Sequence, residues 1–282
     1  MYFKAVARGS FGSCLTDAGL VGYYPAMVSW NPMQYLKFAD ERSRPCRDLI
    51  YRIMLDSPQR IVDLGCGPGN STADLAGRWP DAEITGLDYS TEMITAARNT
   101  YPRQEWIHAD ISSWKALVPV DLIFSNAALQ WVDHHADLLP KLMHMLKAGG
   151  ALAIQMPANY HTAPAQKLIR DLAADTRWHK IFPSVIRKWH CHEPEFYYDL
   201  LSRIATKLDL WTSEYIHILN RYEDIVEWYK GTGLRPYLDV LSTSERADFI
   251  AAYQDLIARN YPPQADGRIL FPFRRLFLIA YR

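Results

Sequence analysis

The chain has 282 residues, of which 49% are hydrophobic and 22% are charged, and its 31 basic residues balance 31 acidic ones. This length and composition predict a globular protein with a sizeable core, and the zero net charge argues against binding to nucleic acid or to a membrane surface. Four scattered cysteines without a C-x-x-C pair, and the lack of an apolar run of transmembrane length, indicate a reduced, cytoplasmic setting.

From residue 60 onward the sequence alternates strand and helix signals. Short apolar runs predict strands at 60–65, 82–88, 104–110, 120–129 and 151–157. Amphipathic segments that begin with capping residues or end at Pro or Gly predict helices at 70–80, 90–102 and 135–150. This alternation is typical of an α/β fold with a mostly parallel sheet and helices on both faces.

The rhythm changes after residue 157. Residues 158–206 are expected to be mostly helical, and strands are predicted at 207–219 and 268–282. Two helices are predicted between these strands, so we interpret about 221–262 as a helical insertion that caps a site. Residues 1–29 have few charges and no regular period, and we expect an irregular N-terminal extension followed by one main domain at 30–282.

A glycine-rich loop follows the first predicted strand, in the stretch IVDLGCGPGNST at residues 61–72. Gly65 permits a tight turn, Gly67 lets the backbone approach a ligand closely, and Gly69 leaves room where the next helix packs on the strand. The N–H groups at the start of that helix favour a negatively charged group. The loop therefore predicts a nucleotide-type cofactor.

Three acids occur in step with the first three predicted strands. Asp63 lies near the end of the first strand, while Asp88 and Asp110 end the second and third. In parallel sheets of this kind, ligands bind outside the carboxyl ends of the strands. The glycine loop and the three acids together support the cofactor prediction much more strongly than the loop does alone.

The stretch VDLGCGPGNST resembles motif I of the class I S-adenosylmethionine-dependent methyltransferases. The resemblance implies a Rossmann-like fold with a seven-stranded sheet whose last strand is antiparallel, a cofactor-binding half at 60–156, and S-adenosyl-L-methionine as cofactor. It also implies that Asp88 binds the ribose hydroxyls and that Asp110 contacts the adenine amino group. Our candidate cofactor residues are Asp63, Gly65, Gly67, Gly69, Asp88, Asp110 and Asn126.

Further stretches, among them WNPMQYLKFADERSRPCRDLI, TGLRPYL and FPFRRLFLIAYR, resemble the branch of this family that methylates a carboxylate of trans-aconitate. The resemblance implies a monomethyl ester and S-adenosylhomocysteine as products, with a small polyanionic tricarboxylate as substrate. Carboxylates are ionised at neutral pH, so we expect in-line positioning and no catalytic general base. Arginine binds carboxylates with directional hydrogen bonds, and the candidate substrate residues are Arg44, Arg235, Arg275 and Trp131.

Three alternatives remain open at this point. The same fold could methylate another small molecule or an acyl thioester. A dinucleotide-dependent oxidoreductase is disfavoured by the G-x-G-x-G spacing and by Asp110, and a non-catalytic sensor of S-adenosylmethionine would carry the same cofactor motifs. His190 and His192 flank Cys191 without a familiar ligand spacing, so no metal is expected, and nothing in the sequence indicates an obligate protein partner.

Overall fold

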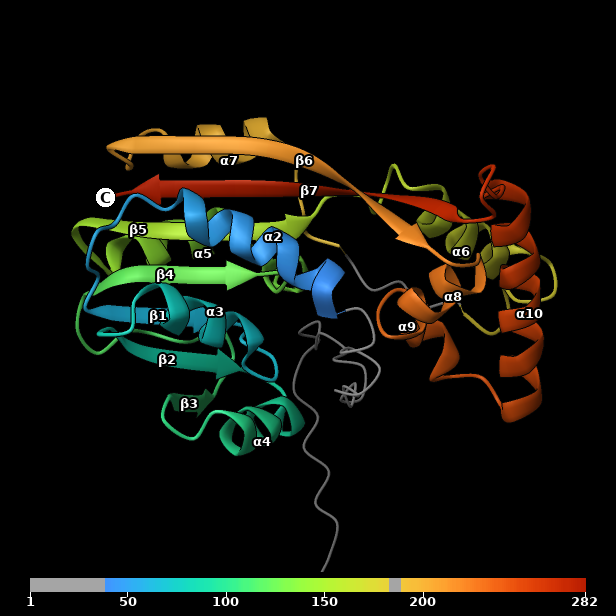
Figure 1. The fold of residues 1–282 in the computed structure, drawn as a ribbon, viewed down its shortest axis with the longest axis horizontal. Coiled ribbons are helices and arrows are strands. Elements are labelled where there is room, and N and C mark those ends of the chain that lie inside the picture. The colour runs from blue at the N-terminus through green and yellow to red at the C-terminus, as the bar shows by residue number, and fades with distance from the viewer. Residues whose placement is uncertain (1–38, 183–188) are drawn as a thin grey trace, which may run out of the picture.

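The computed structural model describes residues 39–182 and 189–282, so the expectation for residues 1–29 lies outside the described residues. Within them, seven strands form one sheet in the order β3-β2-β1-β4-β5-β7-β6 (Figure 1). Strands β1 to β5 are parallel, and β7 runs antiparallel to both β5 and β6. The predicted Rossmann-like, mostly parallel sheet is confirmed. The strands are β1 (Arg60–Leu64), β2 (Glu83–Asp88), β3 (Glu105–His108), β4 (Val120–Asn126), β5 (Leu146–Pro157), β6 (Lys207–Leu219) and β7 (Ile269–Tyr281).

Helices cover both faces of this sheet because alternate residues of each strand point to opposite sides. On β7, Phe277 joins the apolar cluster beneath α2 (Ala39–Arg52) and α3 (Asn70–Arg78). Its neighbour Leu278 joins the cluster beneath α5 (His135–His144) and α7 (Pro194–Leu201). Helix α4 (Thr91–Thr100) packs on β2 and β3 at one edge of the sheet.

The predicted boundary between the helix at 135–150 and the strand at 151–157 is wrong. Helix α5 ends at His144, and β5 already begins at Leu146. Leu146 pairs with Val120 of β4, and the backbone at Gly149 and Gly150 exchanges hydrogen bonds with Arg282. Pairing on both sides draws the two glycines into the sheet, which a local helix pattern does not reveal.

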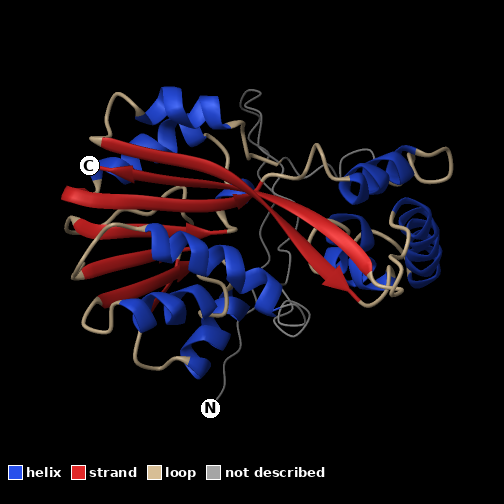
Figure 2. Cartoon of the chain, turned by 45° about the horizontal axis from the view of Figure 1, so that its top comes forward, coloured by secondary structure: helices blue, strands red, loops and turns tan. Residues whose placement is uncertain are grey.

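A helical lobe lies at the far end of the two longest strands. It consists of α6 (Pro164–Ala174), the turns that follow it to residue 182, α8 (Glu223–Lys230), α9 (Arg235–Leu238) and α10 (Thr243–Asn260). Strands β6 and β7 leave the sheet as a twisted ribbon and reach the lobe (Figure 2). Their ends, including Leu219 and Phe271, are buried in the core of the lobe. The lobe contains α6 in addition to the inserted helices at 221–262.

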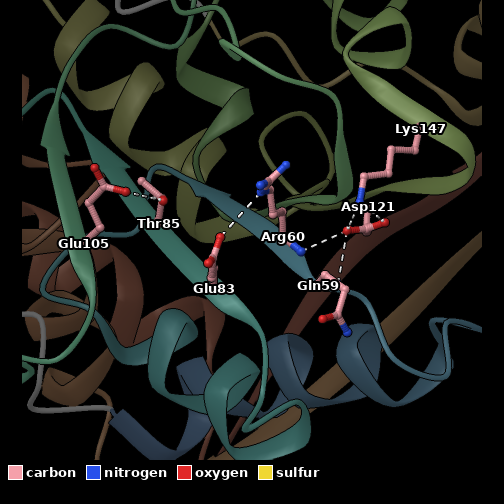
Figure 3. A network of polar contacts seen from close by, with 7 residues as sticks. All are labelled: Gln59, Arg60, Glu83, Thr85, Glu105, Asp121 and Lys147. Atoms are coloured by element: carbon pink, nitrogen blue, oxygen red, sulfur yellow. Dashed lines mark hydrogen bonds and ion pairs between the residues drawn. The ribbon is translucent and has the colours of Figure 1, made fainter.

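The amino ends of the strands are joined by polar contacts (Figure 3). Asp121 at the start of β4 accepts hydrogen bonds from the backbone N–H groups of Gln59 and Arg60, at 3.1 and 2.8 Å. Lys147 Nζ lies 2.9 and 2.8 Å from the two carboxylate oxygens of Asp121. These bonds tie β1, β4 and β5 together at this edge. The opposite, carboxyl edge of the parallel strands faces the helical lobe (Figure 1).

Candidate functional site

The glycine loop forms the turn from β1 into α3 at the carboxyl edge of the sheet. The N–H groups of Gly65 and Cys66 donate to the carbonyl oxygen of Leu87, at 2.7 and 3.0 Å, which fixes the loop on the end of β2. Gly65 has a φ of 74°, and a Cβ at this position would overlap the side chain of Ala128. Glycine is therefore required here for both the backbone angle and the close packing.

Asp88 at the end of β2 contacts this loop, and Asp110 follows the end of the neighbouring strand β3. Asp88 Oδ2 accepts the Gly67 N–H at 2.9 Å, and Asp88 Oδ1 accepts the Ser90 N–H at 2.8 Å. Asp110 Oδ1 accepts the backbone N–H and the hydroxyl of Ser112, both at 2.8 Å. Burial raises the pKa of Asp88, and the backbone N–H bonds oppose that rise. Each carboxylate group still has lone-pair sites, on Oδ2 in the case of Asp110, that a ligand hydroxyl or amino group can use.

Asp63 takes a different position from the other two acids. It is fully buried, and its Oδ2 accepts hydrogen bonds from the hydroxyls of Ser71 and Thr72, at 2.6 and 2.7 Å. Burial raises the pKa of Asp63 to about 6. The residue therefore anchors the first turn of α3 beneath the glycine loop. Its Oδ1 accepts no hydrogen bond from the described residues.

The segment after β4 connects the glycine loop to a neighbouring pocket. Asn126 ends β4, and its Oδ1 has no hydrogen-bond partner among the described residues. Ala127 has a φ of 56°, which is unusual for a residue with a side chain. It is held there because its N–H donates to Gln155 O at 2.9 Å and its O accepts from Gln130 Nε2 at 2.6 Å. One face of this segment, at Ala128, packs on the glycine loop, and Ala127 lines the pocket.

The pocket lies between the carboxyl edge of the sheet and the helical lobe. The empty space between its walls, counted together with the open solvent at its mouth, is about 570 Å³. A second, smaller hollow shares four lining residues with it, so the two lie next to each other, and together they are called the cleft. The main pocket is lined by residues from both parts of the molecule, among them Ala127, Trp131, Trp189, Trp228, Tyr229 and Arg275.

Arg275 is the buried cation of this pocket. Only 4% of its surface is exposed, and it lies on β7, opposite Pro157 of β5. Its guanidinium carbon is 4.4 Å from the ring centre of Phe273, and Nη1 lies 3.5 Å from Gln155 Oε1. Its neighbour Arg274 points to the other face of the strand, where Nη2 lies 3.9 Å from a carboxylate oxygen of Glu193.

The four candidate substrate residues are not all brought together. Trp131 and Arg275 line the same pocket. Arg44 is exposed on α2, and it is not among the residues that line the cleft. Arg235 on α9 is also absent from that lining, and its Nε lies 3.6 Å from Asp239 Oδ2. The assignment of Arg44 and Arg235 to the acceptor therefore stays a prediction.

Several pocket residues were missed at the level of sequence. Gln166 and Arg170 of α6 line the cleft, as do Tyr160 before that helix and Tyr229 on α8. The available signal was the i, i+4 spacing of Gln166 and Arg170, which puts two polar side chains on one side of a helix. No local pattern connects this helix with β7.

Buried polar atoms without partners gather around the pocket. Among the described residues, no hydrogen bond reaches Gln130 Oε1, Gln155 Nε2, the Tyr229 hydroxyl or either side-chain polar atom of Asn159. Leaving such a group unsatisfied costs about 1–3 kcal/mol. Several together indicate a site built for a polar ligand, because ordinary cores satisfy nearly all such groups.

Across residues 39–182 and 189–282, no three His, Cys, Asp or Glu side chains are grouped so that they could bind a metal ion. No helix in the same part of the chain combines the length and apolarity needed to cross a membrane.

Comparison with known sequences identifies similar proteins. A family described as "Methyltransferase domain" matches residues 61–150. The trans-aconitate 2-methyltransferase of Azoarcus sp. (strain BH72) is 48% identical over 263 residues, which cover 91% of this chain and 100% of that protein. The protein of the same name from Escherichia coli O7:K1 is 42% identical over 260 residues, covering 91% of this chain and 99% of its own.

Solved structures share the fold at low sequence identity. The YcgJ protein of Bacillus subtilis aligns with a TM-score of 0.55 at 14% identity, covering 84% of this chain and 98% of that one. Haemonchus contortus phosphoethanolamine N-methyltransferase 2, in complex with S-adenosyl-L-methionine, aligns with a TM-score of 0.52 at 15% identity. That alignment covers 84% of this chain and 52% of the other. At these identities the likeness establishes the fold alone.

Proposed function

Because the chain belongs to the trans-aconitate 2-methyltransferase family, we propose that it transfers a methyl group from S-adenosylmethionine to a carboxylate of trans-aconitate. The observation that carries this proposal is the buried guanidinium of Arg275 in the pocket beside the glycine loop. No Asp or Glu occurs among the described residues that line the cleft. Such a lining suits an anionic acceptor, because arginine binds a carboxylate through directional, charge-assisted hydrogen bonds.

S-adenosylmethionine fits the residues at the glycine loop. A Cβ at Gly67 would meet no atom within 4 Å, so there is open space over the loop. Asp88 borders this space, Asp110 follows the end of β3, and Oδ1 of Asn126, without a partner among the described residues, lies at the end of the adjacent strand β4. We assign cofactor binding to these residues. When bound, S-adenosylmethionine supplies a methyl group on a positively charged sulfur, and its transfer to a carboxylate oxygen leaves S-adenosylhomocysteine.

The residues of the chain have a positioning task in this reaction. The acceptor carboxylate is ionised at neutral pH, so no side chain has to remove a proton from it. Arg275 fixes the acceptor, and the aromatic walls at Trp131 and Trp189 exclude water. Segment 126–131, which touches both the loop and the pocket, brings the two ligands together. Rate enhancement then arises mainly from holding the reacting atoms in line.

The free cysteines bear on the cellular compartment in which the reaction takes place. Cys46, Cys66 and Cys191 are free, and burial raises the pKa of each above its ordinary value. Free thiols without a bridge support a reducing, cytoplasmic compartment.

The test is methyl transfer to trans-aconitate by the wild-type enzyme and by Arg275→Gln and Arg275→Lys. Loss of a buried charge that pairs with the ligand costs about 2–5 kcal/mol, so Arg275→Gln should lower kcat/KM on the order of 30-fold or more. Arg275→Lys should recover part of that loss, because it keeps the charge without the fork of donors. S-adenosylmethionine affinity, measured by calorimetry, should stay within about twofold in both.

Arg274→Gln is the matched control, because it removes the adjacent guanidinium from the opposite face of the strand. It should keep wild-type kcat/KM, and melting temperatures of all variants report on folding. Wild-type protein that does not methylate trans-aconitate would contradict the proposed function. Equal losses in Arg274→Gln and Arg275→Gln would contradict the assignment of Arg275 to the acceptor.

A further inference from the structure

A second arginine, Arg170, lines the cleft, and it lies on helix α6 and not on the sheet. Arg170 lies near the end of α6 and lines the smaller hollow, which shares Trp131, Gln166, Trp189 and Thr232 with the main pocket. Arg275 lines the main pocket and Arg170 does not. The cleft therefore has one arginine in each of its two parts.

Arg170 is held in place by aromatic packing. Its guanidinium carbon lies 4.6 Å from the ring centre of Tyr160, and Nη1 donates to Tyr160 O at 2.7 Å. The Tyr160 ring stacks on Trp189 with an interplanar angle of 8° and 5.3 Å between centres, and Trp189 contacts Trp131 edge-on at 4.8 Å. A guanidinium fixed in such a stack is pre-organised to bind a planar carboxylate.

The charge of Arg170 is not neutralised by a neighbouring acid within the described residues, since no ion pair joins it to a carboxylate there. Arginine has five N–H donors, and the carbonyl of Tyr160 takes one. By contrast Arg177, just beyond α6, also stacks on an aromatic ring, Trp178, but forms an ion pair with Asp248. Arg177 lines neither part of the cleft.

Arg170 and Arg275 act on the same buried hydroxyl. Burial raises the pKa of Tyr229 well above its ordinary value, while the neighbouring Asn159 amide and both guanidinium groups oppose the rise. Within the described residues, neither the Tyr229 hydroxyl nor the Asn159 amide has a hydrogen-bond partner. Arg275 of β7 and Tyr229 of α8 line the main pocket, and Arg170 of α6 lines the hollow next to it.

We infer that Arg170 is a second carboxylate anchor of the acceptor site, so that Arg275 and Arg170 bind two different non-reacting carboxylates of the substrate. This inference rests on the proposed function. It assigns a specificity role to the helical lobe: an acceptor must carry two anionic groups besides the one that is methylated. A dicarboxylate would leave one of the two guanidinium groups without its partner, and a monocarboxylate would leave both without one.

The experiment compares wild-type enzyme with Arg170→Gln, Arg170→Lys and the matched control Arg177→Gln. With trans-aconitate, Arg170→Gln should lower kcat/KM about tenfold to a hundredfold, mainly through KM, because a charge-assisted hydrogen bond to the ligand is lost. Arg170→Lys should recover part of this loss. Arg177→Gln should behave as wild type, and the affinity for S-adenosylmethionine should not change in any variant.

Inhibition by dicarboxylates identifies the group that Arg170 binds. Mesaconate, glutaconate and itaconate each lack a different carboxylate of trans-aconitate, and their inhibition constants are measured against trans-aconitate methylation. Arg170→Gln should weaken two of these inhibitors and leave the third unchanged within about twofold, because the third lacks the carboxylate that Arg170 binds. Arg275→Gln should likewise leave one inhibition constant unchanged, but for a different dicarboxylate, because Arg275 binds a different carboxylate.

Failure of the proposed function and failure of the inference about Arg170 give different results. If wild-type protein does not methylate trans-aconitate, the proposed function is wrong. If wild-type protein is active and Arg170→Gln retains its kcat/KM, or weakens all three inhibitors equally, Arg170 does not bind a carboxylate and the inference is overturned.

Discussion

Asp63 offers a direct test of how the buried end of the glycine loop is built. Its pKa is raised from 3.8 to about 6 by complete burial, against the hydrogen bonds from Ser71 and Thr72. The folded state therefore holds the proton more tightly than the unfolded state. Stability from this group is fully present below pH 4 and is lost as the pH rises through about 6.

The magnitude follows from the difference between the two pKa values. At 1.36 kcal/mol per pH unit, the full effect is about 3 kcal/mol, of which about 2 kcal/mol falls between pH 4.5 and 8. Asp63→Asn removes the charge and keeps an oxygen that can accept from Ser71 and Thr72. Its buried NH₂ group adds a cost that does not depend on pH, so comparing two pH values cancels it.

The assay is urea unfolding of both proteins at several pH values from 4.5 to 8. The stability of wild type minus that of Asp63→Asn should decrease by about 2 kcal/mol over this range. Asp121→Asn is the control at the opposite edge of the sheet. Although partial burial would raise the pKa of Asp121, Lys147 and two backbone N–H groups lower it, so its contribution is lost as the pH falls. A pH dependence of Asp63→Asn identical to that of wild type would refute the reasoning.

Two further predictions concern local structure. Gly67→Ala should cost only about 1–2 kcal/mol of stability, because φ is 56° and the new Cβ meets open space, yet it should weaken S-adenosylmethionine binding in calorimetry. Gly65→Ala adds an overlap with Ala128 to the same backbone strain, so its melting temperature should fall well below that of Gly67→Ala, and equal values would contradict the packing. Ser242→Ala should lower the unfolding free energy by about 1 kcal/mol, since Ser242 and Glu245 form the capping box of α10. An unchanged urea midpoint would show that this cap contributes nothing.

The sequence alone was sufficient for the features that depend on local patterns. Alternating strand and helix signals predict the parallel sheet, since each strand and helix carries its own apolar period and its own end signals. The three glycines and the acids at Asp88 and Asp110 lie within or directly after such elements. Their meeting at the carboxyl edge follows from the rule that ligands bind there in parallel sheets.

Other features depended on how distant segments pair. Arg274 and Arg275 are neighbours of the same type, and only the register of β7 between β5 and β6 decides which one enters the pocket. The strand start at Leu146 depends on pairing with β4 and with Arg282. Arg170 reaches the cleft because α6 packs against α10 in the helical lobe. The strand or helix that carries a side chain decides on which side of that element the side chain points. Which other residues it contacts there depends on the packing of distant segments, and only the tertiary structure decides this.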